Sequence, residues 1–271
     1  MQTFRASGTM AREEPQIIPP DLLIRAYRAG IFPMADSRDD PEVYWVEPRM
    51  RAILPLDGFH LSHSLARTLR RETFRVTVNA AFDQVIDHCA APRPDAQESW
   101  ISGRIRESYR ALHRLGMAHS IETWQTDPSG AERLVGGLYG VGFDRVFCGE
   151  SMFSRVPDAS KVALAWLVAA LRKGGAELLD CQFTTAHLVS LGAIEITQSD
   201  YLDRLAVAMR PWNEGEPGYR GGAFSAGASS AGSSAGAGSV LPAGFAALLD
   251  SAAGSSSSPG KCIAQSLTQT S

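Results

Sequence analysis

Residues 146–183 read VFCGESMFSRVPDASKVALAWLVAALRKGGAELLDCQF, and this stretch predicts an α/β fold. Val146–Phe153 is short, apolar and rich in residues that favour strands, and Glu177–Phe183 has the same character. Between them, Ser160–Lys173 is long and apolar enough to predict a buried helix, which the pair Gly174–Gly175 should end. A strand, a helix and a second strand in this order are the usual unit of an α/β domain.

The flanking sequence extends this unit into a larger sheet. Ala118–Trp124 and Arg133–Val141 are predicted strands, and the turn Gly142–Arg145 should join the second of them to the next strand as a hairpin. The other predicted elements are a strand at Phe74–Val78 and helices at Asp21–Gly30, His60–Arg71, Phe82–Cys89, Ser102–Leu115 and His187–Leu191. We therefore expect a mixed α/β sheet, with a main domain at 81–215 and a smaller N-terminal α/β module at 17–80 that carries a basic helix.

Composition and charge narrow the class of protein. The net charge of −3 argues against a protein that coats nucleic acid, and no apolar run is long enough to span a bilayer. There is no secretory signal, and the cysteines form no CxxC pair, so a reducing cytoplasm fits best. His60 and His63 have no third ligand nearby in the sequence, so we expect no metal site.

The two ends of the chain differ from the body. Residues 1–16 are expected to be a flexible leader, and Met10 is an alternative start. About three quarters of residues 221–260 are Gly, Ala or Ser, a composition that offers little surface to bury. We therefore expect residues 216–271 to form a disordered tail, with a transient helix at Val240–Leu249 as the exception.

Three polar residues stand out on predicted strands. Asp180 and Gln182 should project from one face of their strand, where a carboxylate beside an amide can orient a nucleophile and take its proton. A structural hydrogen-bond network is the alternative for this pair. Glu150 lies among apolar residues and could be a simple ion-pair partner, while its neighbours Phe147, Met152 and Phe153 could wall a pocket or be plain core.

The helix predicted at His60–Arg71 is basic on one side. Its leucines recur every four residues and predict a core-facing side opposite the charges. The basic residues of this helix and the following strand are Arg67, Arg70, Arg71 and Arg75. Such a cluster could bind phosphates, and an ordinary solvated helix face is the alternative.

Several of these segments share an order and spacing with one known family. They are Ala26–Met34, Tyr44-Trp45 with Pro48-Arg49, Ala118–Glu122, Leu134–Val141, Gly149–Ser154, Asp158–Lys161, Asp180–Gln182 and His187–Ala193. Over about residues 20–205 the chain resembles the leucyl/phenylalanyl-tRNA–protein transferase family, and the ordered set is far more specific than any one motif. The chain departs from the family at Met34, at Val46-Glu47 and at Leu138, which bears on the preferred donor.

The resemblance implies both a fold and a reaction. The fold is an acetyltransferase-like mixed sheet of the acyl-CoA N-acyltransferase type. The reaction moves Leu or Phe, with Met as an alternative donor, from aminoacyl-tRNA to the α-amino group of proteins beginning with Arg or Lys, and so marks them for degradation. No cofactor is needed, because the ester is already activated. We also expect a cytoplasmic monomer that contacts no membrane. The resemblance implies that its partners are Leu-tRNA or Phe-tRNA and the acceptor protein.

The resemblance further assigns roles to particular residues. Asp180 and Gln182 would orient and deprotonate the attacking amine, and Glu150 would hold a cationic or amine group in the same pocket. The aminoacyl pocket would be formed by Leu138, Phe147, Met152 and Phe153. The aromatic residues near the tRNA 3′ end would be Tyr27, Trp100 and Tyr109. The tRNA backbone would contact Arg67, Arg70, Arg71 and Arg75.

Two other classes fit parts of the pattern. An acetyl-CoA-dependent N-acetyltransferase needs a glycine-containing pyrophosphate loop before its helix, but Pro157–Lys161 contains no glycine. A non-catalytic module that binds tRNA or protein N-termini would keep Glu150 and the arginines, but would not need Asp180 and Gln182 together.

Overall fold

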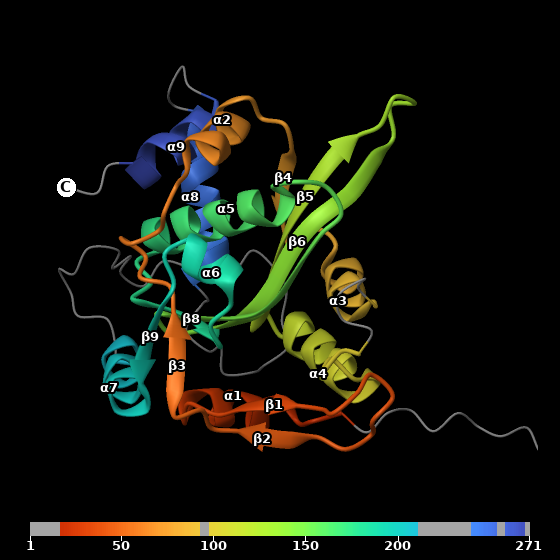
Figure 1. Ribbon diagram of the computed structural model, residues 1–271, viewed down its shortest axis with the longest axis vertical. Helices are drawn as coiled ribbons and strands as arrows, with labels where there is room; N and C mark the ends of the chain where they lie inside the picture. Colours follow the sequence, from red (N-terminus) through yellow and green to blue (C-terminus); the bar gives the residue numbers. More distant parts are fainter. Residues whose placement is uncertain (1–16, 93–97, 211–239, 254–257, 269–271) are drawn as a thin grey trace, which may run out of the picture.

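The computed structural model describes residues 17–92, 98–210, 240–253 and 258–268 (Figure 1). Its helices are α1 (Pro20–Arg28), α2 (His63–Arg70), α3 (Phe82–Ala90), α4 (Gly103–Arg114), α5 (Ala159–Gly174), α6 (Ala186–Ser190), α7 (Gln198–Ala208), α8 (Val240–Ala253) and α9 (Pro259–Thr268). Its strands are β1 (Phe32–Met34), β2 (Tyr44–Val46), β3 (Met50–Ile53), β4 (Arg75–Val78), β5 (Ala118–Thr126), β6 (Glu132–Phe143), β7 (Val146–Ser154), β8 (Leu178–Gln182) and β9 (Ile194–Thr197). None of the described helices is long and apolar enough to cross a membrane.

A seven-stranded mixed sheet organises the molecule. The strand order is β4-β5-β6-β7-β8-β3-β9. Neighbouring strands are antiparallel except for β7 and β8, which run parallel because α5 crosses over between them. The prediction of a mixed α/β sheet is confirmed.

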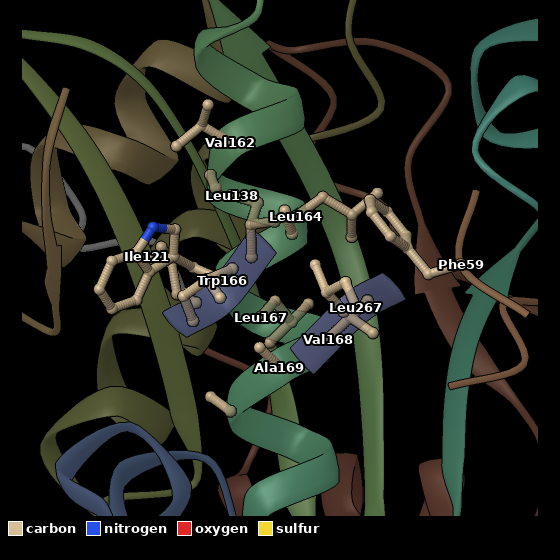
Figure 2. Packing of buried hydrophobic residues seen from close by; sticks show 14 of the residues in the cluster. Phe59, Ile121, Leu138, Val162, Leu164, Trp166, Leu167, Val168, Ala169 and Leu267 are labelled. Atoms are coloured by element: carbon tan, nitrogen blue, oxygen red, sulfur yellow. The ribbon is translucent and has the colours of Figure 1, made fainter. Parts of the chain in front are cut away.

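Helix α5 forms the core on one face of this sheet. Its residues Ala159–Leu171 are buried except Lys161, because the sheet packs on one side of the helix and α8 and α9 pack on it elsewhere. Figure 2 shows Trp166 and Leu167 of α5 among Ile121 from the sheet and Leu267 from α9. Gly175 follows the helix in a left-handed conformation with φ 77°, so the predicted end of α5 is confirmed.

The opposite face of the sheet is covered by α3 and α4, and α1 packs on α4. The largest fully buried side chains of this second core include Tyr27, Phe32, Tyr109 and Tyr139. Three of these carry a hydroxyl group, so this face is apolar in bulk but can supply hydrogen-bond donors to the sheet.

The segment 17–80 takes part in two structures. Strands β1 and β2 form a small antiparallel sheet of their own beside α1. In contrast, β3 and β4 belong to the seven-stranded sheet. β3 lies between β8 and the edge strand β9, and β4 forms the opposite edge. The division of the chain into domains at residue 80 stays a prediction.

Two helices lie within the segment predicted to be a disordered tail. Helices α8 and α9 pack on α5, and α9 also packs on α2. The prediction of a disordered tail is therefore wrong for residues 258–268, and at 240–253 the helix expected to be transient is a packed α8. Residues 1–16, 216–239, 254–257 and 269–271 lie outside the described residues. The physical reason is that a few apolar residues spaced along each helix are buried despite the surrounding Gly, Ala and Ser. These are Leu241, Phe245, Leu248, Ile263 and Leu267.

Candidate active site

The site lies where two central strands separate. Strands β7 and β8 pair from Val146↔Leu178 to Cys148↔Asp180, and beyond this point no pairing joins them. On β7 the register against β6 shifts next to Gly149, which leaves Glu150 at an irregularity. On β8 the backbone of Gln182 adopts φ 63°, a left-handed conformation that is unusual for a residue other than glycine.

A cavity of about 440 Å³ opens at this separation. Its apolar lining comes from the sheet and the residue after β8, from α5, from α6 and from the segment before α4. These residues are Trp100, Leu138, Tyr139, Met152, Leu164, Leu167, Leu179, Cys181, Phe183 and Leu188. The polar side chains that line it are Glu150, Ser151, Gln182, Thr185 and His187, so the cavity combines an apolar wall with a polar region.

Glu150 is buried and is held by neutral donors. Its Oε1 accepts hydrogen bonds from the Tyr27 hydroxyl at 2.7 Å and from Gln182 Nε2 at 2.9 Å. Its Oε2 accepts one from the Tyr109 hydroxyl at 3.0 Å, and the two tyrosine hydroxyls also contact each other. Burial raises the pKa of Glu150 to about 7, and the three hydrogen bonds limit the rise. The carboxylate of Glu150 is thus stabilised by neutral donors, and not by the ion pair that was the alternative interpretation of its sequence position.

Asp180 is buried against an arginine. The Arg51 guanidinium donates Nε to Oδ1 at 2.9 Å and Nη2 to Oδ2 at 2.5 Å, and both side chains are almost fully buried. The Tyr201 hydroxyl donates to Oδ2 at 3.2 Å. Burial opposes the charged form of Arg51, yet the neighbouring Asp180 raises the pKa of the guanidinium, so Arg51 stays charged. Arg51 was not recognisable from the sequence, because its partner Asp180 lies 129 residues away.

Gln182 connects the two carboxylates. Its backbone N–H donates to Asp180 Oδ1 at 2.8 Å, while its side-chain amide donates to Glu150. The structure therefore brings together the three residues that the sequence proposed as catalytic. Asp180 itself also belongs to a hydrogen-bond network, which was the alternative interpretation.

The four residues predicted for the aminoacyl pocket separate into two pairs. Leu138 and Met152 line the cavity. Phe147 is fully buried in the α5 core, and Phe153 packs against His88 on the opposite face of the sheet, so neither lines the cavity. Met152 and Phe153 are consecutive residues of β7, so their side chains point to opposite faces of the sheet and only Met152 reaches the cavity.

The three aromatic residues predicted to lie near the tRNA 3′ end also differ from one another. Trp100 lines the cavity and is partly exposed, so its ring can meet a ligand. Tyr27 and Tyr109 are fully buried, and their hydroxyl groups bind Glu150. Their rings have no exposed face on which a base could stack.

The basic cluster lies on α2, on the residue that follows it and on β4, and none of its arginines lines the cavity. Arg67, Arg70 and Arg71 are exposed, and within the described part of the chain no salt bridge neutralises them. Arg75 is different, because its guanidinium binds both oxygens of Glu132 at 2.5 and 2.7 Å. Three of the four predicted arginines thus remain available to an anion.

Cys181 also lines the cavity. Burial raises the pKa of the Cys181 thiol, which keeps it protonated and unsuited to act as a nucleophile. Across the described residues, no group of three or more His, Cys, Asp or Glu side chains could hold a metal ion.

Fold and site together define a class of protein. It is a mixed α/β protein whose central parallel strands separate around an apolar cavity, with a buried carboxylate and an amide at its polar region. This arrangement suits a ligand that has an apolar side chain next to a polar reacting group.

Comparison with known proteins gives the family. The model of the leucyl/phenylalanyl-tRNA protein transferase family matches residues 53–206, and the model of its N-terminal domain matches residues 17–49. The chain therefore belongs to the leucyl/phenylalanyl-tRNA protein transferase family, a family of aminoacyltransferases.

Individual relatives agree with this membership. The leucyl/phenylalanyl-tRNA–protein transferase of Novosphingobium aromaticivorans is 67% identical over 269 residues, which cover 97% of this chain and all of the relative. Proteins of the same name from Zymomonas mobilis and Rhizorhabdus wittichii are 59% and 58% identical over 71% of this chain, and the matches cover 70% and 75% of those relatives.

Proposed function

We propose that this protein transfers Leu or Phe from aminoacyl-tRNA to the α-amino group of proteins with N-terminal Arg or Lys. Met is an alternative donor. The observation that carries this proposal is the cavity at the separation of β7 and β8, where an apolar wall meets the carboxylate of Glu150 and the amide of Gln182. An apolar aminoacyl side chain would occupy the wall beside Leu138 and Met152, with its ester near the polar groups.

The reaction requires one bond to form and one to break. The amine nitrogen of the acceptor attacks the ester carbonyl carbon, the bond to the tRNA ribose oxygen breaks, and that oxygen receives a proton. Glu150, with a pKa near 7, is matched to hold or take a proton from an α-amino group, whose ordinary pKa is about 8. Gln182 would orient the reacting groups. Asp180 would serve as an electrostatic anchor, because it lines no part of the cavity and is paired with the charged Arg51.

The tRNA would contact two parts of the molecule. Its 3′ end would lie beside Trp100, whose ring can stack on a base. Its phosphates would lie against α2, where Arg67, Arg70 and Arg71 are exposed. Arg75 would contribute less, because Glu132 already pairs with it.

Further parts of the proposal rest on the family resemblance. The parallel pair β7–β8 after the antiparallel β4–β7 fits an acetyltransferase-like sheet of the acyl-CoA N-acyltransferase type. We place the protein in the cytoplasm as a monomer that works without a cofactor. Its products would carry a new N-terminal residue that marks them for degradation.

The direct test is transfer of radiolabelled Leu or Phe from charged tRNA to a peptide that begins with Arg. A peptide that begins with Asp serves as the acceptor control. Gln182→Met keeps the side-chain length but removes the amide that binds Glu150, so we expect transfer to fall by about 100-fold. Gln198→Met is the matched control, because the Gln198 side-chain amide donates to Glu47 at 2.7 Å and lines no part of the cavity.

The outcomes are distinct. Label on the Arg peptide alone, lost in Gln182→Met and kept in Gln198→Met, supports both the reaction and the site. Equal labelling of both peptides would refute the acceptor preference, and no labelling from either donor would refute the reaction.

A further inference from the structure

Arg51 is the largest fully buried side chain of the described residues, yet it lies outside the cavity. It comes from β3, whereas the residues around it come from four other parts of the chain. Its guanidinium donates to Asp180 on β8 and to the carbonyl of Gly30 after α1, at 3.0 Å for the latter. A buried arginine with this many fixed partners holds its neighbours in one arrangement.

Two aromatic rings fix the plane of this guanidinium. The carbon Cζ of Arg51 lies 4.6 Å from the ring centre of Phe32 and 4.5 Å from that of Tyr201. Cation–π contacts on two rings leave the guanidinium little freedom to rotate. Its Nε and Nη2 therefore point at the two oxygens of Asp180 in a fixed fork.

The position of Asp180 in turn fixes the backbone at Gln182. Asp180 Oδ1 accepts the Gln182 N–H at 2.8 Å, and it is the same oxygen that Arg51 Nε contacts. Gln182 has φ 63°, a conformation that costs a residue other than glycine on the order of 1 kcal/mol and needs support from its surroundings. That backbone conformation directs the side-chain amide to Glu150.

We propose that Arg51 is a positioning residue for aminoacyl transfer, which acts through Asp180 and the backbone of Gln182 to hold the Gln182 amide against Glu150. The inference rests on the proposed function, because it concerns the rate of that reaction. Arg51 lines no part of the cavity, so its loss should change the rate of the bound complex rather than the binding of aminoacyl-tRNA.

The test measures kcat and KM for aminoacyl-tRNA in the full chain, with each rate divided by the folded fraction from urea unfolding. We expect Arg51→Met to lower kcat by about 100-fold at an unchanged KM. Arg51→Lys keeps the charge but cannot form two parallel hydrogen bonds, so its kcat should lie between those of wild type and Arg51→Met.

Arg145→Met is the matched control for a purely structural buried arginine. Arg145 is also buried, pairs with Glu177 at 2.6 Å and binds the carbonyl of Val207 at 2.9 Å. This substitution should lower stability and leave kcat per folded molecule close to that of wild type. If Arg51→Met behaves in the same way as Arg145→Met, the inference is overturned.

A milder variant keeps the inference testable if Arg51→Met does not fold. Tyr201→Phe keeps the ring beside Arg51 but removes the hydroxyl that donates to Asp180. We expect its kcat to fall about threefold to tenfold with KM unchanged. A wild-type kcat in a well-folded Tyr201→Phe together with a wild-type kcat in Arg51→Lys would overturn the inference. Absence of transfer by the wild-type protein would instead refute the proposed function.

Discussion

At the scale of single residues, Glu150 has a pKa close to neutral pH, so its charge depends on pH. A carboxyl group this deeply buried favours its protonated form, and only the donors Tyr27, Tyr109 and Gln182 keep its pKa as low as about 7. Because the pKa of Glu150 lies above its ordinary value of 4.5, the folded protein binds this proton more tightly than the unfolded chain does. The stability contributed by the proton is complete below pH 4.5 and is lost as the pH rises through about 7.

Glu150→Gln should remove this dependence on pH. Between pH 4.5 and 7 we expect the free energy of unfolding of the wild type to fall, relative to Glu150→Gln, by up to about 3 kcal/mol. Urea unfolding of both proteins at several pH values measures the difference. Curves that run parallel across this window would contradict the raised pKa.

The sequence could identify the polar residues of the site but not how they are arranged. Asp180, Gln182 and Glu150 stand out because each is a polar residue in an apolar strand. Arg51 does not, because nothing in its local pattern indicates burial. The burial of Tyr27 and Tyr109 is equally hidden, since it depends on helices that meet only in the folded protein.

At the scale of secondary-structure elements, α2 has one apolar and one basic side. Leu65 and Leu69 are buried against the α5 core, which leaves Arg67 and Arg70 exposed. The division follows from the helical spacing and was predictable from the sequence. The partner of Arg75 was not predictable, because Glu132 lies 57 residues further along on β6.

Arg70→Ala should weaken tRNA binding and reduce its dependence on salt. Each phosphate contact releases counterions, so the slope of log K against log salt should become shallower by about 1. Filter binding at several salt concentrations measures this slope. Arg75→Ala should have a smaller effect, and Arg25→Ala, on α1 and paired with Asp21, is the control. Binding that does not depend on salt would rule out a phosphate role for α2.

Helix α8 depends on a close approach at one glycine. A Cβ atom on Gly244 would lie 1.8 Å from the carbonyl oxygen of Ala170 and 2.9 Å from the backbone nitrogen of Gly174. Gly244→Ala should therefore push α8 away from α5 and destabilise the protein by about 1 to 3 kcal/mol. Thermal unfolding measures the loss. Gly103→Ala is the control, because nothing lies within 4 Å of its added methyl group. Equal melting temperatures for the two variants would disprove the close packing.

At the scale of the whole molecule, the long strands and helices were predictable from the sequence, and most of the short strands were not. Strands β5, β6 and β7 and helix α5 were recognisable because each repeats one apolar pattern over many residues. Strands β1, β2, β3 and β9 have three or four residues each, too few to show a period, and α7 was not assigned either. β3 nevertheless carries Arg51, so one of the shortest strands holds a central contact of the site.

The two helices at the C-terminal end complete the core on one side of the sheet. Trp166 of α5 is only 6% exposed and packs on Phe245 of α8 with ring centres 5.3 Å apart. Helix α9 contacts α2, and the Gly260 N–H donates to Glu72 at 3.1 Å. The C-terminal helices are therefore in contact both with α5, in the core, and with the basic helix α2.

Deleting residues 240–271 should destabilise the protein and also weaken tRNA binding. Exposing the face of α5 around Trp166 should lower the free energy of unfolding by about 3 kcal/mol or more, and loss of α9 should loosen α2 and its arginines. Urea unfolding and tRNA binding measure the two effects.

Phe245→Ala should reproduce most of the loss of stability, whereas Leu249→Ala, at a side chain 41% exposed, should cost far less. A truncated chain as stable as the full chain would show that these helices do not contribute to the core. A less stable truncated chain with unchanged tRNA affinity would show that α9 supports α5 but not the basic helix.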